Sequence, residues 1–215
     1  MKQLLTSSGF TTKEIADALE QLVGKEKDKI SFAIINEAHA VEDGDKSWVL
    51  DELANFCKYF PGYVAIVDLL ALSSEEILKQ ALECDVIYVL GDNTDYLMKV
   101  YNDSGFADMI QNELKDKVYV GSSAGSMVVC KRVSTKAYEE VYGESKNYGI
   151  EKYIGLNDFS IKPHLGSSEF INNREEVLTR IAKTFDGKIF GMRDDQSILV
   201  NENEIIFIGG DIFSC

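Results

Sequence analysis

The stretch VYVGSSAGSMVVC, residues 118–130, holds the most informative pattern in the chain. An apolar, β-branched run at residues 118–120 leads directly into the pentapeptide GSSAG at residues 121–125, and an apolar segment suited to a helix follows. Strand, tight turn and helix in this order are typical of a nucleophile elbow, G-x-S-x-G, whose central serine here is Ser123. The alternative interpretation is a tight turn that carries no chemistry.

The small residues around Ser123 suit the geometry of such an elbow. Glycine at positions 121 and 125 lets backbone segments approach closely, and the strained turn presents the serine side chain. The N-terminus of the following helix directs free N–H groups at negative charge that develops during acyl transfer. We therefore expect Ser123 to be a nucleophile and the amide of Ala124 to be an oxyanion donor.

Short apolar runs alternate with helix-period segments on both sides of this stretch. Strands are predicted at residues 2–6, 30–35, 63–67, 86–90, 118–120, 159–161, 189–192, 198–200 and 204–208, and helices at 12–23, 46–60, 73–82, 95–101, 106–114 and 169–185. The alternation favours an α/β fold whose mostly parallel sheet is covered on both faces. Since no linker or internal repeat interrupts it, we predict one domain over residues 1–215.

Ligands of parallel sheets bind at the carboxyl ends of the strands, so chemistry is expected in the loops that leave those ends. These loops are residues 7–11, 36–45, 91–94, 121–125 and 163–168. In the sequence GDNT at 91–94, Gly91 is expected to present its amide as a second oxyanion donor. Asn93 or Thr94 is expected to cap the helix that follows.

A serine nucleophile needs a base, and the chain has only two histidines, His39 and His164. Both follow predicted strands, and His164 also follows Pro163, which stiffens the approach. Asp194 and Asp195 follow the predicted strand 189–192 and are candidates for the carboxylate that orients the base. The order Ser, His, Asp differs from the Ser, Asp/Glu, His order of α/β-hydrolases, so that fold is disfavoured.

Composition excludes several classes of protein. The 215 residues include 45% hydrophobic residues and carry a formal charge of −14, so a folded core is expected and nucleic acid is an unfavourable partner. No apolar run approaches the length of a membrane helix, and the polar N-terminus does not resemble a signal peptide. The four cysteines form no C-x-x-C pair, which indicates reduced thiols, a cytoplasmic location and no zinc site. No metal or cofactor is expected.

Five segments together make the chain similar to peptidase family S51, the family of peptidase E and cyanophycinase. They are LLTSSG at 4–9, GDNT at 91–94, GSSAG at 121–125, KPH at 162–164 and GMRDD at 191–195. The resemblance implies a three-layer sandwich like that of class I glutamine amidotransferases, which is also flavodoxin-like. It further implies that Ser123 is the nucleophile, that His164 is the base, and that Gly91 and Ala124 form the oxyanion hole.

The sequence departs from the family pattern at two positions. Asp92 replaces the second glycine of the usual GGNT loop, and Asp194 stands where the family acid is usually Glu. A cation is needed to recognise an acidic substrate side chain. Arg174 and Arg193 lie near the expected site and are candidates for this role, and Asp92 and Asn93 are further candidates for substrate binding. The alternative is that this acidic chain accepts a substrate α-ammonium through Asp or Glu.

These patterns predict a serine peptidase for dipeptides or short peptides, with N-terminal aspartyl peptides as one candidate substrate class. One alternative is another acyl hydrolase, such as an esterase or amidase, on the same scaffold. The other is a non-catalytic, flavodoxin-like binding module in which residues 6–9 cradle a phosphate. The expected partner is a small peptide rather than nucleic acid or a membrane, and the protein is expected to be a monomer or homodimer.

Overall fold

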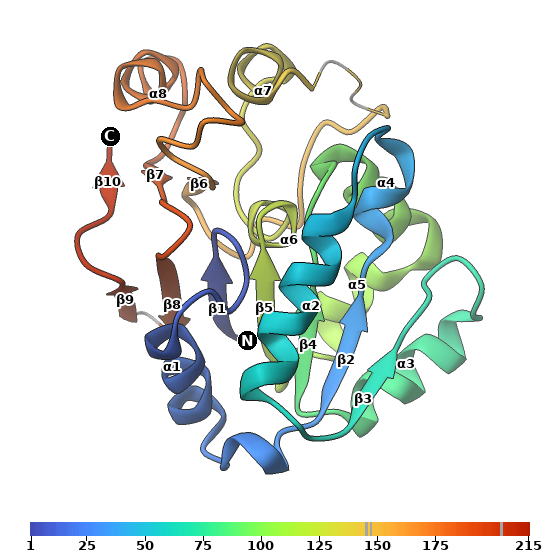
Figure 1. Cartoon of the computed structure of the whole chain (residues 1–215). Helices are drawn as coiled ribbons and strands as arrows, with labels where there is room; N and C mark the ends of the chain where they lie inside the picture. The colour runs from blue at the N-terminus through green and yellow to red at the C-terminus, as the bar shows by residue number, and fades with distance from the viewer. Residues whose placement is uncertain (145, 147, 203) are drawn as a thin grey trace.

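The computed structural model describes residues 1–144, 146, 148–202 and 204–215, and its centre is a seven-stranded, mostly parallel sheet (Figure 1). In spatial order its strands are β3 (Val64–Ile66), β2 (Phe32–Ile35), β4 (Val86–Val89), β5 (Val118–Ser122), β1 (Lys2–Thr6), β8 (Ser197–Asn201) and β9 (Glu204–Ile208). Only β8 and β9 run antiparallel to their neighbours. The predicted α/β fold with a mostly parallel sheet is confirmed.

Alternate strand residues pack against opposite faces of this sheet, which makes the three layers. Leu4 of β1 belongs to an apolar cluster with α1 (Lys13–Val23) and α2 (Ser47–Tyr59), whereas its neighbour Leu5 belongs to the cluster on the other face. That other face is covered by α3 (Ser74–Glu83), α4 (Thr94–Ser104) and α5 (Phe106–Asn112) (Figure 1). Burial of both faces explains why the central strands read as continuous apolar runs.

Three short strands form a second sheet that the sequence did not predict. Their spatial order is β10 (Phe213–Ser214), β7 (Ile189–Gly191) and β6 (Ser160–Lys162). The loop at 163–168 therefore leaves the small sheet and not the central one, which corrects the expectation that all five loops share one sheet. This loop leaves the small sheet and lies beside the elbow of the central sheet.

The C-terminal helix is shorter than predicted. It is α8 (Glu175–Ala182), not 169–185, because the preceding residues are held by tertiary contacts. Asn173 Nδ2 donates to the Pro163 carbonyl at 2.5 Å, and the Arg174 guanidinium donates to the carbonyls of Ser167, Phe170 and Asn173.

Two further helices differ from the sequence prediction. No helix was predicted between residues 131 and 158, but this segment contains α7 (Thr135–Tyr142). Ser134 caps the helix at its N-terminus, and Gly143 ends it in a left-handed conformation. The helix after the elbow, α6 (Ala124–Met127), is a single turn. The predicted strands 198–200 and 204–208 pair antiparallel as β8 and β9, and Asn203 between them lies outside the described residues.

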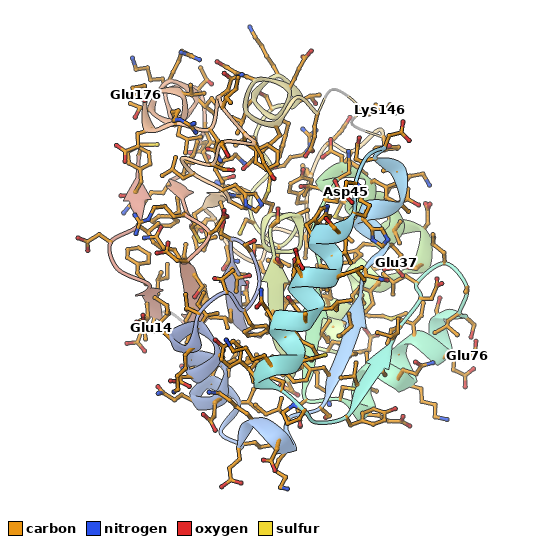
Figure 2. The ribbon with its side chains drawn as sticks, viewed as in Figure 1. Glu14, Glu37, Asp45, Glu76, Lys146 and Glu176 are labelled. Atoms are coloured by element: carbon orange, nitrogen blue, oxygen red, sulfur yellow. The ribbon has the colours of Figure 1, made fainter. Side chains whose placement is uncertain are left out.

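Acidic side chains such as Glu14, Glu76 and Glu176 project from the outer surfaces of the helices (Figure 2). Much of the formal charge of −14 is thus solvated. None of the helices among the described residues has the length and apolar character needed to span a membrane.

Candidate active site

Ser123 occupies a strained turn between β5 and α6. Its φ of 48° and ψ of −113° lie outside the regions that serine normally adopts, and such a conformation costs roughly 1–3 kcal/mol. Two hydrogen bonds to the Thr6 carbonyl hold the turn, from the Ser123 amide at 3.2 Å and from Ser126 Oγ at 2.8 Å. Gly125 must be glycine because a Cβ there would lie 2.3 Å from the Val89 carbonyl oxygen.

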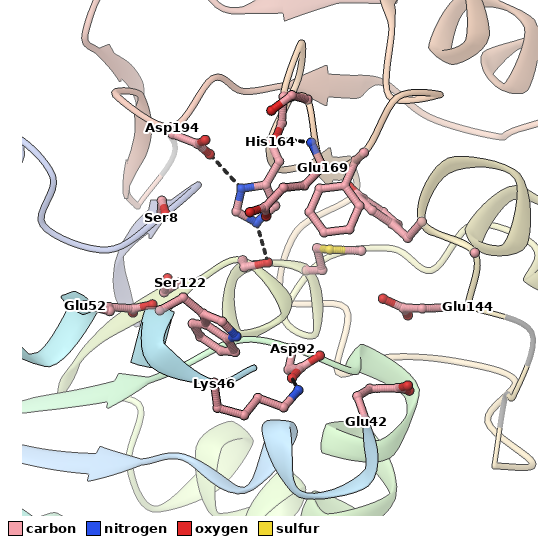
Figure 3. Close-up of a pocket in the computed structure, with 18 of the residues that line it drawn as sticks. Ser8, Glu42, Lys46, Glu52, Asp92, Ser122, Glu144, His164, Glu169 and Asp194 are labelled. Carbon is pink, nitrogen blue, oxygen red and sulfur yellow. Dashed lines mark hydrogen bonds and ion pairs between the residues drawn. The ribbon is translucent and has the colours of Figure 1, made fainter. Parts of the chain in front are cut away.

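His164 is the histidine that lies beside this serine. Its Nε2 is 2.9 Å from Ser123 Oγ, and its Nδ1 is 2.6 Å from Asp194 Oδ1 (Figure 3). His164 follows β6 with a φ of 65°, a second strained backbone position at the site. His39 does not line the same cavity. Of the two histidines, the structure brings only His164 to Ser123.

Asp194, and not Asp195, contacts the imidazole. Burial opposes ionisation of Asp194, but the hydrogen bond and the charge of His164, with a hydrogen bond from Ser7, outweigh burial and lower the pKa of Asp194. Asp195 is exposed, and its Oδ1 lies 3.5 Å from Arg193 Nε. Of the two candidate acids, Asp194 is the one that contacts His164.

Ser7 is a site residue that the sequence analysis did not assign to this role. Its Oγ accepts from the His164 amide at 2.8 Å and donates to Asp194 Oδ1 at 3.0 Å. Ser7 is fully buried. The position of Ser7 directly after a central strand indicated that it could lie at the site. Its partners Asp194 and His164 could not be inferred, because they are more than 150 residues away in sequence.

Gly91 and Ala124 lie together next to Ser123. A Cβ on Gly91 would be 2.6 Å from Ser123 Cβ and 3.1 Å from the Ala124 nitrogen, so only glycine fits there. Ala124 is the first residue of α6, so its amide has no acceptor within the helix. The Gly91 amide donates no hydrogen bond within the described part of the chain. Two backbone amides without a hydrogen-bond acceptor in the described part of the chain therefore lie beside Ser123.

Asp92 and Asn93, the expected substrate-binding residues of this loop, have different surroundings. Asp92 lines the cavity with an unusual φ of 128° and forms an ion pair with Lys46. Asn93 is fully buried: its Oδ1 accepts from the Tyr96 amide and caps α4, and its Nδ2 donates to Glu42 Oε1 at 2.6 Å. Asn93 thus positions Glu42 in the cavity wall.

A cavity of about 600 Å³ opens in front of Ser123. Phe170 stacks on the His164 ring with 5.2 Å between ring centroids, and Glu52 lies at the other side of the serine (Figure 3). Burial raises the pKa of Glu52, whose Oε1 accepts from the Tyr88 hydroxyl at 2.5 Å. Neither Phe170 nor Glu52 was singled out from the sequence, because a lone aromatic or acid on a helix reads as core or surface.

Arg174 and Arg193, the expected cations of the site, are not in the cavity wall. The Arg174 guanidinium is occupied by the backbone carbonyls of its own loop, and Arg193 lies against Asp195. Among the described residues, the basic side chains that line the cavity are Lys46, Lys146 and His164. Nor do those residues include a group of three or more His, Cys, Asp or Glu side chains placed to hold a metal ion.

The pattern of peptidase family S51 matches residues 3–208. The chain belongs to peptidase family S51. An uncharacterized peptidase of Pasteurella multocida is 26% identical over 212 residues, which cover 98% of this chain and 99% of the relative. An uncharacterized peptidase of Listeria monocytogenes is 28% identical over 146 residues, which cover 65% of this chain and 68% of the relative.

Solved structures show the same fold. A putative peptidase E from Listeria monocytogenes superposes with a TM-score of 0.77 at 22% identity, over 96% of each chain. A peptidase from an acI-B1 actinobacterium gives a TM-score of 0.67 at 16% identity, over 97% of this chain and 87% of the other. The predicted resemblance to family S51 and to the class I glutamine amidotransferase fold is confirmed, and S51 membership makes the protein a serine peptidase.

Proposed function

We propose that the protein hydrolyses dipeptides or short peptides through an acyl-enzyme formed on Ser123. His164 is the general base, Asp194 orients it, and the amides of Gly91 and Ala124 stabilise the oxyanion. The observation that carries the proposal is the hydrogen-bonded chain Ser123 Oγ, His164 Nε2 and Nδ1, Asp194 Oδ1, with separations of 2.9 and 2.6 Å.

The hydrogen bonds around His164 select the tautomer that the reaction needs. An ionised Asp194 only accepts hydrogen bonds, so Nδ1 carries the proton at this contact. Nε2 is then unprotonated and accepts the hydrogen of the Ser123 hydroxyl. As Ser123 Oγ attacks the peptide carbonyl, its proton passes to Nε2, and the resulting imidazolium is stabilised by Asp194.

The second half of the reaction uses the same groups in reverse. The protonated His164 gives its proton to the leaving amine, and the carbonyl of the cleaved peptide stays as an ester on Ser123 Oγ. Water, deprotonated by His164, then attacks this ester. As the ester C–O bond breaks, Ser123 Oγ takes the proton back from His164 and the acid product leaves. In both steps the negative oxygen lies against the amides of Gly91 and Ala124, which are in place before reaction.

A cavity of this volume suits a short peptide better than a folded protein. The non-catalytic alternative receives no support, because Ser7 of the supposed phosphate cradle is occupied by His164 and Asp194. Other acyl hydrolase activity would use the same nucleophile, so the assay includes aminoacyl esters and amides beside dipeptides.

The test compares wild type with Ser123→Ala and Ser122→Ala in dipeptide hydrolysis and in labelling by a fluorophosphonate. Ser123→Ala is expected to lose activity by about a thousandfold or more and to lose labelling. Ser122→Ala removes the hydroxyl of a buried neighbour in the same turn and is expected to retain labelling. Hydrolysis that survives in folded Ser123→Ala protein would refute the proposal.

A further inference from the structure

The cavity in front of Ser123 is acidic. Of the residues that the structure describes, seven with carboxyl side chains line it, against two lysines and His164. One of the lysines, Lys46, is already paired with Asp92, and the other, Lys146, is exposed to solvent. A bound group that enters this cavity therefore meets an excess of negative charge close to a low-dielectric wall, where electrostatic selection is strongest.

Three of these carboxyls gather on the side of the cavity away from His164. Figure 3 shows Glu42, Asp92 and Glu144 around one region, apart from His164 and Asp194. Glu42 is held there by Asn93 Nδ2 at 2.6 Å, and Asp92 by its ion pair with Lys46. These two carboxyls have protein partners that fix their positions.

Glu144 differs because it has no such partner. Its carboxyl makes no hydrogen bond or ion pair with any residue that the structure describes, although it points into the cavity (Figure 3). Burial, followed by the charges of Asp95, Glu42 and Asp92, raises the pKa of Glu144 to about 8, against a smaller opposing effect of Lys162. The side chain of Glu144 is half-buried in the cavity wall, so its unpaired carboxyl is open to a bound group.

The arginines of the chain offer no counter-charge for an acidic substrate. Arg132 forms a buried pair with Asp95, Arg180 pairs with Glu140, and Arg193 lies against Asp195. The Arg174 guanidinium donates to backbone carbonyls. A substrate carboxylate next to Glu144 would be desolvated beside like charges, which is unfavourable.

We propose that the face formed by Glu42, Asp92 and Glu144 binds a positively charged group of the substrate's acyl half, with Glu144 as its direct partner. This inference rests on the proposed function. The leaving amine must face His164 to receive its proton, so the acyl substituent points to the opposite side, where these carboxyls lie. The recognised chemistry is an ammonium or guanidinium cation, supplied by the peptide N-terminus or by a basic side chain.

Binding of such a cation has a second consequence. An adjacent positive charge favours the ionised carboxyl, so it lowers the pKa of Glu144. At pH 7 the protein then releases a proton when the cation binds. The charged groups that shift the pKa of Glu144 are Asp95, Glu42, Asp92 and Lys162; Asp95 and Asp92 have ion-pair partners, and Glu42 accepts from Asn93. Burial lowers the pKa of Lys162 to about 7, so any proton release that remains without the Glu144 carboxyl is assigned to Lys162.

The experiment measures binding of dipeptides X-Leu to Ser123→Ala protein by calorimetry, where X is lysine, norleucine, asparagine or aspartate. Each is used with a free and with an acetylated N-terminus. We expect aspartate to bind more weakly than its neutral isostere asparagine. A preference for lysine over norleucine identifies a side-chain cation, and loss of affinity on acetylation identifies the α-ammonium; either outcome supports the proposal.

Glu144→Gln, made in the same Ser123→Ala background, assigns the effect to this residue. The preference for the charged form is expected to fall about tenfold or more, because a hydrogen bond to a charged group is lost. Proton release, measured in buffers of different ionisation enthalpy at pH 7, is expected to disappear. Glu169→Gln is the matched control, since Glu169 lines the cavity on the His164 side and the substitution replaces the same carboxyl by the same amide.

Three results would overturn the inference: aspartate bound as tightly as asparagine, no preference for a cation in either arm, or equal effects of Glu144→Gln and Glu169→Gln. Turnover is scored separately with wild-type protein. A retained cation preference without any hydrolysis would count against the proposed function and for the cation site. Hydrolysis that favours aspartyl peptides would count against the cation site alone.

Discussion

His164 Nδ1 lies 2.6 Å from Asp194 Oδ1, and this contact connects the loop after β6 to the turn after β7. Asp194→Asn is expected to lower kcat by on the order of 10³-fold or more, because the amide can donate to Nδ1 and so stabilise the tautomer with a proton on Nε2. Asp195→Asn is the control, and its kcat is expected to stay near wild type. Equal losses in the two variants would show that the acid is not Asp194.

Ser7 joins both ends of that contact. Because its hydroxyl donates to Asp194 and accepts from the His164 amide, Ser7→Ala is expected to lower kcat by about tenfold to a hundredfold with little change in KM. Thr11→Ala removes a hydroxyl that donates only to the Asp194 main-chain carbonyl, so it tests the loop without touching the carboxylate. A loss of stability without a loss of kcat in Ser7→Ala would mean that the hydroxyl is only structural.

Asp92 has a φ of 128°, which an L-residue rarely adopts and glycine adopts readily. Asp92→Ala and Asp92→Gly both lose the ion pair with Lys46, but only the glycine relieves the backbone. The glycine variant is therefore expected to be more stable than the alanine variant by about 1 kcal/mol or more, after the greater chain entropy of glycine is subtracted. Urea unfolding measures this difference, and two equal midpoints would contradict the strain.

Lys162 is fully buried, with its Nζ 4.6 Å from the Tyr138 ring centroid, and burial lowers its pKa to about 7. Between pH 7 and the ordinary lysine value of 10.5, the unfolded chain binds this proton and the folded chain does not. Stability therefore rises with pH over that window, by up to about 1.4 kcal/mol per pH unit from this group.

Lys162→Met is expected to remove that part of the slope. Urea unfolding at pH 7, 8 and 9 compares it with wild type and with Lys79→Met, which removes an exposed lysine. The Lys79→Met slope is expected to match wild type. If Lys162→Met also matches wild type, then the buried amine holds its proton in the folded protein.

The sequence alone was sufficient for the features that are local in the chain. Apolar runs of strand length predicted the central strands, and the pattern at residues 121–125 predicted the elbow, because both depend on neighbouring residues. The same reliance on local pattern made the predicted helix at 169–185 too long. Its periodicity continues through Asn173 and Arg174, whose side chains instead bond to the Pro163 carbonyl and to the carbonyls of their own loop.

What the sequence by itself determined is the α/β class, the elbow at Ser123 and the resemblance to family S51. Only the tertiary structure decided that His164 and Asp194 meet Ser123, that Ser7 joins them, and that Glu144 lies unpaired in the cavity. The physical reason is distance along the chain. Hydrogen bonds between Ser7 and Asp194, 187 residues apart, depend on how two sheets are placed, and no local pattern encodes that placement.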